Sequence, residues 1–279
     1  MLKTRIITAI FLLAGLLGAL FFLPDREWIA FCALIGALAA WEWGGLAGWG
    51  KKGRIAYGVV LGGGCCVPWV VAARASQGSL FDPLALLMLL AVAFWLLIVP
   101  LCLRYKWPLR DWSAALTGIV VLLPPTLSMG MGPRPLPLLA WCAIAWVADI
   151  AAYFSGRAFG GKKLAPNISP GKTWAGAVGA LIGVSLYCNI VVFCFWDRPP
   201  PAPQWMFLLQ LVFIGLAVVS IMGDLFESLL KRQAGLKDSS RILPGHGGIL
   251  DRIDSLTSTL PCLAPCLVLL DFIFPVPCV

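Results

Sequence analysis

Long apolar segments joined by short polar loops make up most of this chain. Nine segments can be drawn, each near the roughly 20 residues that a helix needs to cross a bilayer. They span residues 6–23, 28–48, 55–73, 84–103, 112–131, 136–154, 173–195, 205–225 and 256–275. We therefore predict an all-α fold, that of a polytopic integral membrane protein with about nine transmembrane helices.

The first and third segments are the least regular of the nine. Lys3 and Arg5 precede the first apolar core, as in a signal sequence. No small-x-small cleavage site precedes Pro24, so we expect a retained helix. The glycines at 62–64 and Pro68 interrupt the third segment, which leaves open whether it is broken or re-entrant.

The composition agrees with a membrane location. Of the 279 residues, 60% are hydrophobic and 12% are charged, whereas soluble domains carry about 25% charged residues. This balance, with a mean hydropathy of +0.91, excludes an ordinary water-soluble domain. The ten cysteines and the single histidine show no zinc-binding spacing. We interpret the cysteines as small apolar residues within helices.

Alternate loops differ strongly in positive charge. Of the 21 Lys and Arg residues, 17 fall on the side of the N-terminus and 4 on the other side. This bias predicts a cytoplasmic N-terminus, and it places the loops after the sixth and eighth segments on the same cytoplasmic face. Because the cations are scattered over these loops, we attribute the net charge of +8 to lipid headgroups and orientation, and we expect no nucleic-acid partner.

Residues 224–255 concentrate the ionisable groups of the chain, with four Asp, one Glu and five Lys or Arg. On a helix, positions i, i+3, i+4 and i+7 share one face, and here they are Asp224, Glu227, Ser228 and Lys231. After the loop, the same spacing returns in Asp251, Asp254, Ser255 and Ser258. The sequence therefore predicts two acidic helix faces separated by a basic loop.

Carboxylates near hydrocarbon are costly, at roughly 2.5–3.5 kcal/mol each on insertion scales, so they need partners or a wet cavity. Asp149, near the end of the sixth segment, is a further such group. We expect three helix ends to meet at one cytoplasm-facing cavity. The alternative is a set of interfacial carboxylates that pair with nearby Lys and Arg. Ligands that are oxygen atoms alone favour Mg²⁺ and a reaction at phosphates.

A second basic loop, residues 160–173, ends in Gly-Lys-Thr. A Walker A loop needs glycine at position 166, and the chain has Pro166, so we reject that motif. Lys172 and Thr173 at a helix start predict an anion site, and a loop that only sets topology is the alternative. His246, flanked by glycines, is interpreted as a phosphate contact in preference to a structural histidine.

The spacing of these polar residues resembles the signature of the phosphatidate cytidylyltransferase family, also called CDP-diacylglycerol synthases. The matching positions are Ser228, Lys231, Arg232, Lys237, Asp238, Pro244, His246, Gly247, Gly248, Asp251, Arg252 and Asp254. Residues 149–174 resemble a second motif of this family, which includes Asp149, Ser169, Lys172 and Thr173. Many members have an acidic or amide residue where this chain has Ala175, so we assign that position no role.

The resemblance implies a reaction in which CTP and phosphatidic acid give CDP-diacylglycerol and pyrophosphate. It implies Mg²⁺ as the cofactor, accompanied in family members by K⁺ as a second ion. By motif position, Asp224 and Asp251 hold the metal, and Asp254 is either a further ligand or a group that orients Arg252. The implied catalytic residues are Asp224, Asp251, Asp254, Lys231 and Arg252. The implied substrate-binding residues are Ser169, Lys172, Thr173, Ser228, Arg232, Lys237, Asp238, His246, Gly247, Gly248 and Asp149.

We expect residues 1–132 to form a scaffold and residues 133–279 a catalytic region within one continuous membrane domain. A bacterial inner membrane is the expected location, because no extended N-terminal region precedes the first segment. The family implies a homodimer, which the Gly-x-x-x-Gly at Gly179 and Gly183 does not establish. Two alternatives stay open: a CTP-dependent enzyme acting on an isoprenoid lipid, and an ion-coupled transporter.

Overall fold

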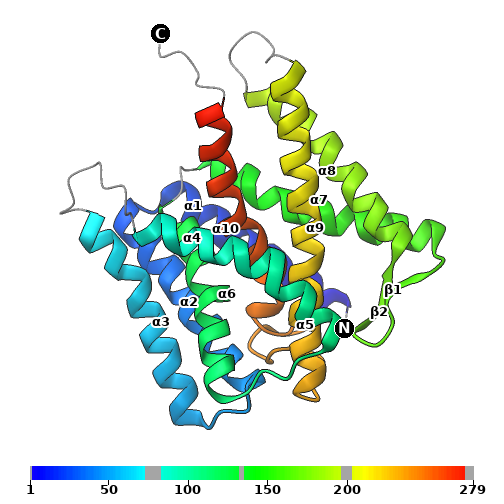
Figure 1. The fold of residues 1–279 in the computed structure, drawn as a ribbon. Coiled ribbons are helices and arrows are strands. Elements are labelled where there is room, and N and C mark those ends of the chain that lie inside the picture. Colours follow the sequence, from blue (N-terminus) through cyan, green and yellow to red (C-terminus); the bar gives the residue numbers. More distant parts are fainter. Residues whose placement is uncertain (1, 73–82, 132–134, 196–202, 274–279) are drawn as a thin grey trace.

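The computed structural model describes residues 2–72, 83–131, 135–195 and 203–273, and within them the fold is almost entirely helical (Figure 1). The helices are α1 Leu2–Phe22, α2 Asp25–Leu46, α3 Lys51–Ala72, α4 Pro83–Ala93, η1 Phe94–Ile98, α5 Val99–Tyr105, α6 Asp111–Met131, α7 Leu136–Phe159, α8 Trp174–Phe195, α9 Pro203–Gln233 and α10 Leu250–Ile273. One antiparallel hairpin, β1 Lys163–Ala165 with β2 Ser169–Thr173, precedes α8.

Within the described residues each predicted apolar segment coincides with a helix over most of its length, and the fourth corresponds to α4, the π-helical turn η1 and α5 in succession. Residue 73 of the third segment and residues 274 and 275 of the ninth lie outside the described residues. By length and composition, six helices of the described residues could cross a membrane. They are Asp25–Leu46, Leu84–Tyr105, Asp111–Gly130, Leu136–Phe159, Trp174–Cys194 and Pro203–Gln233. A shorter apolar helix, Ile6–Phe22, lies within α1. The all-α integral membrane fold is therefore confirmed at this level.

Three features differ from the sequence-based expectation or complete it. The third segment is one unbroken helix, α3, across its glycines and Pro68. The eighth apolar segment ends at 225, and α9 continues to Gln233, which confirms the helical face predicted for residues 224–231. Helix α10 begins at Leu250, ahead of the ninth apolar segment, and so includes the second predicted face. Both added stretches are amphipathic, and hydropathy alone does not detect them: Phe226, Leu229 and Leu230 are buried while the intervening positions are polar.

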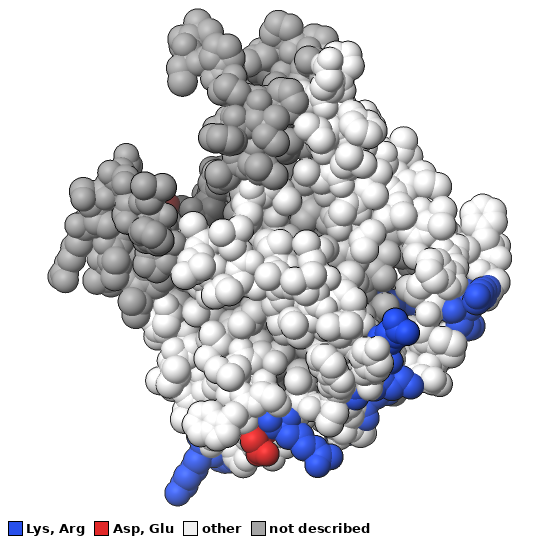
Figure 2. Space-filling model, viewed as in Figure 1, with Lys and Arg blue, Asp and Glu red and all other residues white. Residues whose placement is uncertain are grey.

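The helices pack as neighbouring pairs around a central axis. Helix α7 packs along α8, α2 along α3, and α9 along α10. Figure 1 shows α9 and α10 side by side in the middle of the molecule, with α7 and α8 on one flank and α2, α3 and α6 on the other. Lys and Arg gather at the lower end of the face in Figure 2, and the described surface above them is largely free of charge.

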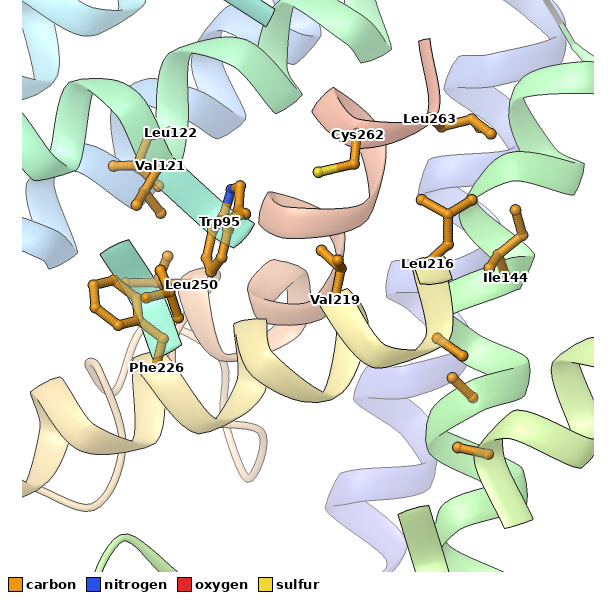
Figure 3. Close-up of a cluster of buried hydrophobic side chains, with 14 of the residues drawn as sticks. Trp95, Val121, Leu122, Ile144, Leu216, Val219, Phe226, Leu250, Cys262 and Leu263 are labelled. Carbon is orange, nitrogen blue, oxygen red and sulfur yellow. The ribbon is translucent and has the colours of Figure 1, made fainter. Parts of the chain in front are cut away.

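A buried aromatic cluster joins the two halves of the chain. Trp95 of η1 is fully buried, and its ring meets that of Phe226 of α9 edge-on, with centroids 5.7 Å apart. Figure 3 shows Trp95 next to Phe226 and Leu250, with Val121 and Leu122 of α6 beyond it. This packing places the polar end of α9 against the start of α10, where the acidic residues lie. The division of roles at residue 132 stays a prediction.

The crossing of α9 and α10 depends on Gly223. A methyl group there would lie 2.8 Å from the main-chain oxygen of Asp254 and would overlap Ser258. The Ser258 hydroxyl donates to the Val219 carbonyl at 2.9 Å, so the helices are also joined by a hydrogen bond at this point.

We predict that Gly223→Ala lowers the free energy of unfolding by about 1–3 kcal/mol, because overpacking forces the two backbones apart. Gly215→Ala is the matched control on the same helix, since nothing lies within 4 Å of its added methyl group. Unfolding in detergent micelles, followed by circular dichroism, measures both variants. Equal stability of the two would contradict the close approach at Gly223.

Candidate functional site

Four helices and the hairpin enclose a cavity of about 600 Å³ at the end of the molecule where α10 begins. Its charged lining consists of the carboxylates Asp149, Asp224, Asp251 and Asp254 and the cations Arg157, Lys172 and Arg252. The predicted anion-site residue Thr173 also lines it. The cavity thus gathers residues from both polar loops, as the sequence predicts, together with Asp149 from α7.

The hairpin delivers Lys172 to this cavity. Strands β1 and β2 pair with Lys163 opposite Thr173 and Ala165 opposite Ser169. Thr173 then starts α8, because its hydroxyl accepts a hydrogen bond from the Gly176 N–H at 3.1 Å. One residue earlier, Lys172 Nζ lies 2.5 Å from Asp224 Oδ2 on α9. The second basic loop is therefore joined directly to the first acidic face.

The polar face of α9 has the predicted helical arrangement. Ser228 donates to Asp224 Oδ1 at 3.3 Å, four residues back. Lys231 donates to Glu227 Oε2 at 2.8 Å with the same spacing. Lys231 also reaches Asp251 Oδ1 of α10 at 2.6 Å. One ammonium group thus bridges carboxylates from two helices.

The cluster around Lys231 is deeply buried. The side chain of Lys231 is 12% exposed, and those of Glu227 and Asp251 are each 5% exposed. Charges removed from water in this way need close partners, because desolvation is expensive. Two carboxyl groups share one ammonium group here, so Lys231 is the common partner of both acidic side chains.

Backbone N–H groups supply the remaining compensation at Asp251. Its Oδ2 accepts hydrogen bonds from the Ser239 N–H at 2.9 Å, the Ser239 hydroxyl at 3.0 Å and the Gly248 N–H at 2.8 Å. The loop 234–249 therefore folds back onto a carboxylate at the start of α10. Asp251 both lines the cavity and anchors this loop.

Asp254 and Asp149 are linked through Ser255. The Ser255 N–H donates to Asp254 Oδ1 at 2.8 Å, and the Ser255 hydroxyl donates to Asp149 Oδ2 at 3.1 Å. These bonds join α7 to α10 on the cavity wall. Three helices consequently carry carboxylates to one space, together with Lys172 from the hairpin.

Other predicted site residues lie outside the cavity lining. Arg232 donates to the Ile168 carbonyl at 3.3 Å and so ties α9 to the hairpin that contains Ser169. Lys237 and Asp238 are exposed on the loop. His246 is half-buried, and its Nδ1 is buried with no hydrogen-bond partner among the described residues. The predicted contacts of these residues with substrate therefore stay predictions.

The structure places two glutamates next to the site: Glu227, which the sequence assigns to an acidic helix face but to no catalytic or binding role, and Glu42, to which the sequence assigns no role. Glu227 shares Lys231 with Asp251. Glu42 of α2 is fully buried and accepts four hydrogen bonds from residues of the segment 239–250. A signal for Glu42 was present, since a single ionisable residue inside an apolar segment is by default a functional candidate.

The donor set fits a hard cation that shares its ligands with phosphates. Carboxylate oxygens are the ligands available, which suits Mg²⁺. In the part of the chain that the structure describes, no three His, Cys, Asp or Glu residues are grouped closely enough to enclose a metal by themselves. Mg²⁺ commonly uses one or two carboxylates and completes its shell with water and substrate phosphates. Asp224 and Asp251, which line one cavity, fit that pattern.

The fold and the cavity define an integral membrane protein with a mixed acidic and basic site suited to anionic, phosphorylated ligands. The chain belongs to the cytidylyltransferase family, whose model matches residues 3–270. It is 40% identical over 274 residues to a phosphatidate cytidylyltransferase of Pseudomonas aeruginosa, which covers 95% of this chain and 96% of the relative. It is 34% identical to the phosphatidate cytidylyltransferases of Haemophilus influenzae (94% and 96% covered) and Brucella suis (92% and 90% covered).

The buried Lys231 cluster leads to a stability prediction. Removing the ammonium group with Lys231→Met leaves two buried carboxylates without their cation, and breaking a buried pair in this way costs about 3–5 kcal/mol. The double variant Lys231→Met with Glu227→Gln should recover part of this loss, because it removes one of the two orphaned charges. Unfolding in detergent micelles measures the free energy.

The matched control for this prediction is Lys237→Met, which removes an exposed lysine six residues further along the chain. Its stability should stay close to that of the unmodified protein. A loss for Lys231→Met no larger than that of Lys237→Met would show that the buried bridge contributes little.

Proposed function

We propose that this protein transfers CMP from CTP to phosphatidic acid, which gives CDP-diacylglycerol and pyrophosphate. The observation that carries the proposal is the convergence of signature residues from both motifs on one cavity. These residues are Asp149, Lys172, Thr173, Asp224, Asp251, Arg252 and Asp254. The family membership and the full-length relatives named phosphatidate cytidylyltransferase support the same reaction.

The reaction joins two anionic molecules, and this determines what the protein must provide. A phosphate oxygen of the lipid attacks the α-phosphorus of CTP, and the bond from that phosphorus to the oxygen bridging it to the β-phosphorus breaks. Pyrophosphate leaves with the electron pair. Because the nucleophile is already an anion, no strong protein base is required. Charge neutralisation and in-line positioning by Lys172, Arg157 and Arg252 are the main protein contributions.

Lys172 is suited to move between two anionic partners. In this structure it is paired with Asp224, and both side chains keep about a quarter of their surface exposed, at 23% and 25%. We infer that a substrate phosphate takes Lys172 as its partner and leaves Asp224 Oδ2 available as a ligand. Thr173 and the N–H groups at the start of α8 lie beside this lysine and can bind the same phosphate.

Asp224 and Asp251 would hold Mg²⁺, with Asp254 close by as a third carboxylate, and K⁺ is the candidate second ion. When bound, the cation would neutralise phosphate charge and help to align the two substrates. Arg252, which lines the cavity beside these groups, would contact the phosphates directly. Lys231, which does not line the cavity, would hold the Asp251 carboxylate in place by donating a hydrogen bond to Asp251 Oδ1.

The proposed membrane arrangement has nine spans with the cavity on the cytoplasmic side of a bacterial inner membrane. It rests on the assignment of 17 of the 21 Lys and Arg residues to one side of the membrane. The Lys and Arg residues gathered at one end of the molecule in Figure 2 and the bacterial origin of the relatives support the same arrangement. CTP would then arrive from the cytoplasm while the acyl chains of the lipid stay in the bilayer.

We predict that purified protein releases pyrophosphate from CTP in the presence of Mg²⁺ and phosphatidic acid, and that Asp224→Asn or Asp251→Asn lowers kcat at least about 100-fold. The substitutions remove ligand charge at nearly constant size. Asp111→Asn, at the exposed start of α6, is the control. Activity that survives both cavity substitutions in folded protein, as judged by size-exclusion chromatography, would refute the metal assignment.

The choice of lipid acceptor is tested in the same assay. We expect phosphatidic acid to be used with a much higher kcat/KM than a polyisoprenyl phosphate or alcohol. A preference for the isoprenoid would redirect the proposal to that lipid class. Uptake of a solute by proteoliposomes without any turnover of CTP would favour a transporter instead.

A further inference from the structure

Glu42 lies in the last turns of the apolar helix α2 (Asp25–Leu46) and accepts four hydrogen bonds. It is fully buried in α2. Its Oε1 accepts hydrogen bonds from the Ser240 hydroxyl at 2.6 Å and the Ile249 N–H at 2.9 Å. Its Oε2 accepts from the Ser239 hydroxyl at 2.9 Å and the Leu250 N–H at 2.7 Å. All four donors belong to the segment 239–250, about two hundred residues further along the chain.

These donors come from both ends of one loop, so a single carboxylate closes it. Ser239 and Ser240 begin the segment, whereas Ile249 directly precedes α10 and Leu250 is its first residue. The first N–H groups of a helix have no partner within the helix, and an anion there is favourable. Glu42 therefore acts as an N-terminal cap for α10 that is supplied by a different helix.

The same loop residues also hold Asp251. The Ser239 hydroxyl lies 2.9 Å from Glu42 Oε2 and 3.0 Å from Asp251 Oδ2, so its single proton is shared between the two carboxylates, while the Ser239 N–H donates to Asp251. Gly248 donates its N–H to Asp251, and a methyl group on Gly248 would overlap Ser239 and the Glu42 carboxylate. Glu42 and Asp251 thus accept hydrogen bonds from the loop on two sides, with Ser239 between them. No space remains for a side chain at position 248.

The compensation of Glu42 is made of hydrogen-bond donors and not of a cation. Among the described residues, no Lys or Arg forms an ion pair with it. A buried carboxylate is tolerated when several donors satisfy it, and such charge-assisted bonds are strong and directional. Their direction is what fixes the loop and the first turn of α10 in one place.

We propose that Glu42 is a positioning residue for the reaction: from the N-terminal half it orients segment 239–250 and thereby the Asp251 carboxylate in the cavity. The effect on turnover rests on the proposed function, whereas the effect on the loop does not. This role extends the site into residues 1–132, which sequence reasoning treats as scaffold.

The first test compares Glu42→Gln with Glu27→Gln, a matched substitution at the exposed start of the same helix. The glutamine keeps the size of Glu42, but it removes the charge and turns an NH₂ group toward donors. We expect kcat for CDP-diacylglycerol synthesis to fall about 10- to 100-fold, the usual range when a group supporting a ligand is lost. Glu27→Gln should leave kcat unchanged.

Glu42→Asp separates positioning by charge from simple packing. Aspartate keeps the negative charge with a shorter reach, whereas glutamine keeps the shape without the charge. The proposal expects kcat in the order Glu, Asp, Gln. If Glu42→Gln is as active as Glu27→Gln, or more active than Glu42→Asp, the carboxylate has no positioning role.

Hydrogen–deuterium exchange provides a readout that needs no activity. In Glu42→Gln, the amides of 239–250 should exchange faster, with those of Ile249 and Leu250 most affected, while amides of α7 and α8 keep their rates. Unchanged exchange in 239–250 would overturn the proposal. If the unmodified protein shows no CTP turnover but the loop still exchanges faster in the variant, the proposed function fails and the anchoring by Glu42 stands.

Should Glu42→Gln not fold, Ser240→Ala keeps the proposal testable. This variant removes one hydroxyl donor to Glu42 Oε1 from a partly exposed position outside the cavity lining. We expect faster exchange in 239–250 and a smaller loss of kcat. Unchanged exchange and unchanged kcat together would overturn the proposal.

Discussion

Negative charge surrounded by apolar helices is the constraint on which the rest of this structure depends. Carboxylates buried in this way are unstable unless donors or cations lie within hydrogen-bonding distance. Asp224 is met by Lys172, Asp251 by Lys231 and by N–H groups of the loop, and Glu42 by four donors of segment 239–250. Each solution brings together segments that are distant in sequence, so the requirements of charge determine much of the tertiary arrangement around the cavity.

The loop 234–249 shows how such compensation produces order in a segment that has little regular structure. It contains an isolated bridge between Leu243 and Gly247, and the described residues pair it with no neighbouring strand. Several of its hydrogen-bond donors bind two carboxylates instead, Glu42 on one side and Asp251 on the other. A loop held in this way can carry glycines for close contacts and still keep a defined shape.

The sequence predicts the elements of this protein better than the contacts between them. Apolar periods identify the helices, and the spacing of Asp224, Glu227, Ser228 and Lys231 correctly predicts one helical face. The end of α9 and the start of α10 lie outside the apolar segments because hydropathy responds to lipid exposure and not to backbone conformation; only the spacing of their polar residues indicates that these turns are helical. The hairpin before α8 is likewise too short and too polar to give a strand pattern.

The site itself could be located from sequence but not assembled. Two polar stretches with a shared spacing point to one cavity, because ionisable groups in a membrane protein need each other. Which cation pairs with which carboxylate could not be predicted. Lys231 lies four residues after Glu227 on α9, as an ion pair within one helix requires, and yet it also contacts Asp251 of α10. Glu42 is the clearest omission: its partners lie about two hundred residues away, and a pattern read along the chain has no means of joining them.

Burial separates the two lysines that neutralise the acidic faces. Lys231 and its partners are 5–12% exposed, and of these three only Asp251 reaches the cavity lining. Lys172 and Asp224 are 23–25% exposed, and both line the cavity. An ion pair in contact with water has a small net stability, and one removed from water is costly to break. The buried Lys231 bridge is therefore the costlier of the two to break, and it holds α9 to α10. The Lys172 pair costs less to open, and this difference in burial is what the proposed transfer of Lys172 from Asp224 to a phosphate requires, in the same cavity of about 600 Å³.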